Sequence, residues 1–68
     1  MNEETFNLSI RQFLKKVGVG SQREIEHAVA AALQAGTIPD NVSLPCRMTL
    51  QIDSLKLEVV YDGSIELA

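Results

Sequence analysis

Apolar residues recur at helical spacing along the first part of the chain. From residue 6 onward they fall at i, i+4, i+7, i+8 and i+11, which forms one stripe and predicts a helix from about Glu3 to Val17. The members of this stripe are Phe6, Ile10, Phe13, Leu14 and Val17. Asn2 is placed to cap the helix, and Leu8 lies about 180° from the stripe, so it is expected to face away from a core.

A second helix is predicted after a glycine break. Gly18 and Gly20 interrupt the first pattern, and Ser21-x-x-Glu24 has the spacing of a capping box, in which each side chain bonds the other residue's backbone N–H. The helix would run from about Gln22 to Gln34 or Ala35, and Gly36 would supply the left-handed residue that ends it. Its buried face would comprise Ile25, Ala28, Val29, Ala32 and Leu33.

The hydrophobic period changes to two at Ser43, which is typical of half-buried strands. A two-residue turn at Asp53-Ser54 would pair Ile52 with Leu55 and place every apolar pair on one face. The apolar series on that face is Leu44, Cys46, Met48, Leu50 and Ile52, followed by Leu55, Leu57, Val59 and Tyr61. Cys46 is therefore expected to be buried.

Asp62-Gly63 predicts a second reversal into a third strand at Ser64–Leu67. A two-residue turn of this composition would pair Val60 with Ile65 on the outer face. A three-residue loop would instead pair Tyr61 with Ile65 and bring the last strand into the core. We favour the three-residue loop for a monomer, whereas the two-residue turn would create an apolar outer strip suited to a partner.

The predicted order is ααβββ. Helices followed by strands are typical of the α+β class, so we expect an N-terminal αα-hairpin packed on one face of a three-stranded antiparallel meander, in a single domain over residues 1–68.

Part of this pattern resembles a known family. Met1-Asn2-Glu3-Glu4-x-Phe6-Asn7, the run from Phe13 to Val19 and the run from Ser21 to Glu26 are similar to a family of small bacterial proteins of unknown function. The resemblance covers the two predicted helices closely and the strands loosely. It implies a small bacterial cytoplasmic protein and transfers neither an activity nor site residues.

Composition and charge narrow the classes of function. The net charge of −3 disfavours nucleic acid and anionic membranes as partners. There is no apolar N-terminal run and no stretch of membrane-spanning length, and the single cysteine suits a reducing cytoplasm. A 68-residue chain without a disulfide is marginally stable alone, so self-association as a homodimer is expected.

No residue pattern indicates catalysis, cofactor binding or a metal site. Cys46 and His27 are the only thiol and the only imidazole, and the predicted elements point them in different directions. The carboxylates are explained as helix-surface and turn residues. We therefore expect a protein that is not an enzyme and needs no cofactor.

The preferred function is a small cytoplasmic interaction or accessory protein that self-associates. Leu8 and Val60 are apolar on predicted outer faces and are the expected partner contacts, with Arg47 and Lys56 as a polar rim.

The alternative is a nucleic-acid-binding regulator of the helix-turn-helix type. It would read bases with Gln22, Arg23 and His27 at the start of the second helix. Glu24 and Glu26 stand beside them and would repel phosphates.

Overall fold

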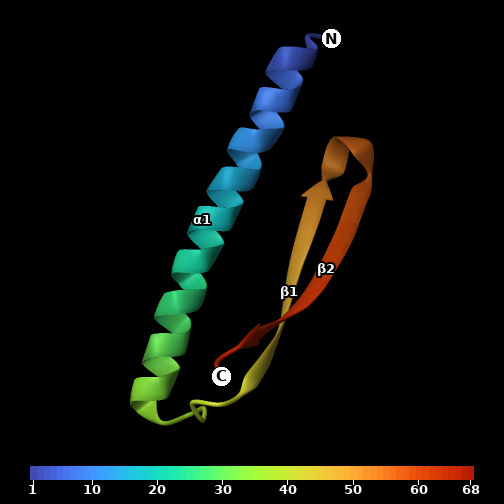
Figure 1. Cartoon of the computed structure of the whole chain (residues 1–68). Coiled ribbons are helices and arrows are strands. Elements are labelled where there is room, and N and C mark those ends of the chain that lie inside the picture. The colour runs from blue at the N-terminus through green and yellow to red at the C-terminus, as the bar shows by residue number, and fades with distance from the viewer. The chain divides into compact units, whose positions relative to one another are not determined.

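The computed structural model describes all 68 residues as one helix followed by one β-hairpin (Figure 1). The helix α1 spans Glu3–Ala35, and the strands β1 and β2 span Ser43–Ile52 and Leu57–Glu66, joined through the short 3-10 helix η1 at Asp53–Leu55. The chain divides into two compact units, Met1–Thr37 and Ile38–Ala68.

Both ends of α1 are capped as the sequence predicts. The Asn2 side chain accepts the Thr5 N–H at 3.1 Å, which satisfies one of the free donors of the first turn. Gly36 adopts a left-handed conformation with φ of 72° and donates its N–H to the carbonyls of the last turn. Thr37 closes this end with a backbone N–H to the Ala32 carbonyl at 3.0 Å.

The predicted αα-hairpin is wrong, because α1 continues through the glycine segment without a break. Gly18 and Gly20 have ordinary negative φ values, and Ser21 lies in the helix interior, where it cannot act as an N-cap. A glycine inside a helix costs about 1 kcal/mol relative to alanine, whereas a break would forfeit a full turn of backbone hydrogen bonds. The apolar stripe also continues in phase across the glycines, from Val17 through Ser21 to Ile25, so one helix presents it unbroken.

The hairpin pairs β1 and β2 antiparallel over ten residues each. Ile52 lies opposite Leu57, and the pairing continues residue by residue to Ser43 opposite Glu66. The predicted register is therefore wrong by two residues. Since a shift of two preserves the face of every side chain, the predicted division into an apolar and a polar face still holds.

The connection between the strands is longer than the predicted Asp53-Ser54 turn. It comprises η1 and Lys56, which adopts a left-handed conformation with φ of 51° and donates its N–H to the Asp53 carbonyl at 3.0 Å. Asp-Ser lacks the glycine that tight two-residue turns favour. A type I′ turn would require a positive φ at both Asp53 and Ser54, whereas the longer loop requires it only at Lys56. Leu55 consequently lies in the loop and is 69% exposed.

The predicted third strand is also wrong. Asp62 and Gly63 do not form a turn but continue β2, where Gly63 lies opposite Cys46 and Ile65 opposite Leu44. Continued pairing with β1 adds ladder hydrogen bonds and places Ile65 on the apolar face. Either predicted turn at Asp62-Gly63 would end the pairing with β1 and reverse the chain. The protein is thus one long helix and a two-stranded antiparallel sheet, not an αα-hairpin with a three-stranded meander.

No side chain of the chain is buried. A single helix has no second layer packed along its side, and a two-stranded sheet has two open faces. Neither unit can therefore enclose an interior by itself. Cys46, which the strand pattern predicted to be buried, is accordingly exposed.

The position of the N-cap is testable by paired substitutions. Asn2→Ala should lower the free energy of unfolding by about 1 kcal/mol through loss of the cap, whereas Ser21→Ala should leave it unchanged or raise it by up to about 0.5 kcal/mol through helix propensity. Urea denaturation followed by helical circular dichroism measures both. A loss on Ser21→Ala as large as that on Asn2→Ala would indicate a helix start at Ser21.

The continuity of β2 is testable at Gly63. A Cβ on this residue would lie 3.5 Å from the Cys46 Sγ, an ordinary contact distance, and its backbone needs no positive φ. Gly63→Ala should therefore stabilise the hairpin by about 0.5–1 kcal/mol. A loss of stability in the same denaturation assay would instead indicate a glycine-dependent turn.

Candidate interaction surface

The helix presents one continuous apolar stripe, which we call the α1 stripe. It runs along more than 25 residues of a helix about 50 Å long. Its N-terminal half consists of large side chains that remain exposed, including Phe6 at 48% and Phe13 at 52%. The complete stripe comprises Phe6, Ile10, Phe13, Leu14, Val17, Ser21, Ile25, Ala28, Val29 and Ala32.

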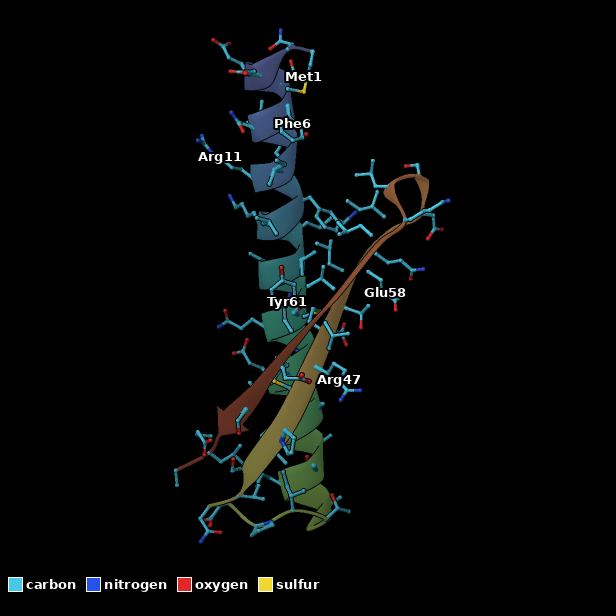
Figure 2. The ribbon with its side chains drawn as sticks, turned by 90° about the vertical axis from the view of Figure 1, so that its right-hand side faces the viewer. Met1, Phe6, Arg11, Arg47, Glu58 and Tyr61 are labelled. Atoms are coloured by element: carbon cyan, nitrogen blue, oxygen red, sulfur yellow. The ribbon has the colours of Figure 1, made fainter.

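The hairpin presents a second apolar surface, the hairpin apolar face. It consists of five cross-strand pairs, in which the members of each pair lie directly opposite one another. These pairs are Leu44–Ile65, Cys46–Gly63, Met48–Tyr61, Leu50–Val59 and Ile52–Leu57. Tyr61 projects from this face in Figure 2, whereas Arg47 and Glu58 project from the other side of the hairpin.

The opposite face of the hairpin is polar and internally hydrogen-bonded. Arg47 Nε donates to the Asp62 carboxylate at 3.1 Å across the strands. Near the open end, the Ser43 and Ser64 hydroxyls lie 2.7 Å apart, and both donate to the Glu66 carboxylate. Val60 is the one large apolar side chain on this face, opposite Thr49. The contrast between the two faces identifies the apolar one as the side that needs a cover.

The partner contacts predicted from the sequence are all exposed. Leu8 is 54% exposed on the side of α1 away from the stripe, and Val60 is 46% exposed on the polar face of the hairpin. Arg47 is held by Asp62, and Lys56 closes the strand connection. Their role as contacts stays a prediction.

The continuity of the α1 stripe through Ser21 was not predicted from the sequence, although Val17, Ser21 and Ile25 follow one another at intervals of four residues, which is helical spacing.

The helix-turn-helix interpretation loses its structural basis. Gln22, Arg23 and His27 lie in the middle of a continuous helix, with no turn before them and no second helix to hold them against a groove. Gln22 and Arg23 also diverge by about 100° around the axis. Their exposure is that of an ordinary solvated helix surface.

The two residues with distinctive side-chain chemistry lie in different units. His27 is in the helix and Cys46 is in the hairpin, and neither side chain makes a hydrogen bond within its unit. Histidine, cysteine and carboxylate side chains form no group of three or more that could hold a metal ion.

Comparison with known proteins gives one match. The sequence model of a family of unknown function, DUF6494, matches residues 1–68. The chain belongs to this family. The resemblance predicted from the N-terminal motifs, to a small-protein family of unknown function, is confirmed, and the match extends it over the strands. No curated protein and no solved structure matches the chain.

The structure contains no helix that combines the length and the apolar character needed to cross a membrane. In α1 the charged residues interrupt every long apolar window; they are Glu3, Glu4, Arg11, Lys15, Lys16, Arg23, Glu24 and Glu26.

The cross-strand ion pair on the polar face should contribute little to stability. The side chains of Arg47 and Asp62 are 71% and 70% exposed, so water screens their attraction. Asp62→Asn should therefore change the free energy of unfolding by no more than about 0.5 kcal/mol. Urea denaturation at low and high salt measures this, and a large loss that salt does not reduce would show that Asp62 acts through something other than the pair.

Proposed function

We propose that this protein is a non-enzymatic interaction module whose working form is a homodimer. The observation that carries the proposal is the absence of any buried side chain in a chain of which 46% is hydrophobic. A single helix gains most of its stability in proteins from packing of its apolar face, and an isolated two-stranded hairpin is marginal in water. Both units therefore need a cover.

The apolar surfaces of the two units support an interface. The α1 stripe and the hairpin apolar face each lack a cover within their own unit, and large side chains on both stay exposed, including Phe13 at 52% and Tyr61 at 58%.

A second copy is the simplest partner that offers such a surface. It carries the same apolar areas, so a two-fold arrangement satisfies both chains at once and closes the assembly. The net charge of −3 is small enough for two copies to associate at physiological ionic strength.

One further observation supports the cytoplasmic part of the proposal. The free thiol of Cys46 favours a cytoplasmic location, where thiols stay reduced.

The mass of the protein in solution tests the proposal directly. Light scattering and sedimentation between about 1 and 100 µM should give twice the 7.5 kDa chain mass at the upper end, and the thermal midpoint should rise with concentration because dissociation accompanies unfolding. A chain mass of 7.5 kDa across this range, with a constant midpoint, would refute the homodimer.

A matched pair of helix variants locates the contact. Ile10 belongs to the α1 stripe and Leu8 lies on the opposite side, and both are exposed apolar residues of the same helical turns. Ile10→Gln should raise the dimer Kd by about tenfold or more, while Leu8→Gln should leave it unchanged. The reverse result would place the contact at Leu8, the residue that the sequence predicts as a partner contact.

A further inference from the structure

The two central glycines of α1 have no explanation within the helix unit. A Cβ built on Gly18 or Gly20 would meet nothing in that unit within 4 Å, and neither residue has a positive φ. Each therefore weakens the helix relative to alanine without relieving any strain or clash in it. Glycine at such a position is typical of a site where another backbone approaches closely.

The size of the side chains along the α1 stripe is uneven. The N-terminal half carries large residues such as Phe6 and Phe13, and the C-terminal half carries small ones such as Ala28 and Ala32. Two parallel copies would set large residues against large ones and leave gaps between the alanines. Two antiparallel copies would set large against small at a constant separation, which is how well-packed layers interdigitate.

We propose that α1 pairs with α1 of a second copy in antiparallel orientation, with the two-fold axis at Val19. This proposal rests on the proposed homodimer and specifies its interface. Counting outward from Val19 in both directions, eight of the ten members of the α1 stripe meet another member, whereas Leu14 meets Glu24 and Val29 meets Ser9. The layers pair Phe6 with Ala32, Ile10 with Ala28, Phe13 with Ile25 and Val17 with Ser21.

The same axis sets the glycines of the two copies at matching levels along the helices. Gly18 of one copy lies at the level of Gly20 of the other, and these residues flank the stripe on its two sides. Without side chains at these four positions the two backbones can approach closely at the point where the helices cross. The glycine pair and the large-to-small pairing are separate features of the sequence, and both place the axis at the same residue.

Most charges near the middle of α1 agree with this orientation. The basic residues Arg11, Lys15 and Lys16 precede the axis and the acidic residues Glu24 and Glu26 follow it, whereas Arg23 has the opposite placement. In the antiparallel pair, Glu26 lies between the levels of Arg11 and Lys15 of the other copy on one flank. On the other flank Lys16 lies between the repulsion of Arg23 and the attraction of Glu24 of the other copy. In a parallel pair Lys16 and Glu24 of the two copies are about 12 Å apart along the helix and cannot pair.

Glycine substitution separates helix propensity from interhelical contact. The double variant Gly18→Ala, Gly20→Ala should form a more helical chain by circular dichroism and yet raise the dimer Kd about tenfold or more, because the added methyl groups push the backbones apart. Val19→Ala is the control, since it raises helix propensity between the same glycines on the side of α1 away from the stripe, and it should leave Kd unchanged. A double variant that dimerises as tightly as the natural protein would overturn the close crossing.

Charge reversal tests the orientation. Lys16→Glu and Glu24→Lys should each raise the dimer Kd about three- to tenfold at low salt, and the two changes in one chain should restore it. In a parallel pair Lys16 and Glu24 of the two copies lie about 12 Å apart along the helix, so each single change acts independently of the other residue and the double change brings no rescue.

The outcomes separate this inference from the proposed function. A natural protein that is monomeric at every concentration refutes both. A natural protein that dimerises, with a Kd insensitive to Lys16→Glu and Glu24→Lys, refutes the antiparallel pairing and leaves the homodimer standing.

Discussion

The constraint on which this structure depends is that neither a single helix nor a two-stranded sheet can form a buried core by itself. Burial of apolar surface is the main favourable term in folding, and it requires at least two layers that cover one another. In this chain the α1 stripe and the hairpin apolar face are both well formed, with consistent phase and register, yet no member of either is buried. The elements are therefore specified locally, while their stabilisation calls for a further surface.

The sequence predicts the local chemistry of this fold better than its connectivity. The caps at Asn2 and Gly36, the start of β1 at Ser43 and the division of the hairpin into two faces are all confirmed. Each follows from a few adjacent residues or from a period of two, and such signals do not depend on distant contacts.

The errors arise where a short motif competes with a longer element. Ser21-x-x-Glu24 has the spacing of a capping box, and Asp62-Gly63 has the composition of a turn, but both lie inside a continuous helix or strand. A local motif contributes about 1 kcal/mol, which is less than the hydrogen bonds that a long helix or ladder keeps by continuing through it. The spacing of the apolar residues on either side of each motif indicates that the helix or strand continues through it. The low degree of burial could be anticipated from the length of the chain, whereas the extent of the apolar stripe could not, because it depends on α1 being one helix.

The hairpin has one more property, which follows from its having only two strands. Both β1 and β2 are edge strands, so each carries a row of backbone N–H and C=O groups with no neighbour. Such edges can recruit further strands without limit and lead to fibrous aggregates. Pro45 removes one donor from β1, and β2 alternates its apolar residues with Glu58, Asp62 and Glu66, whose repulsion opposes the stacking of identical copies. These features oppose open-ended polymerisation through the edges of a hairpin that leaves its apolar face uncovered.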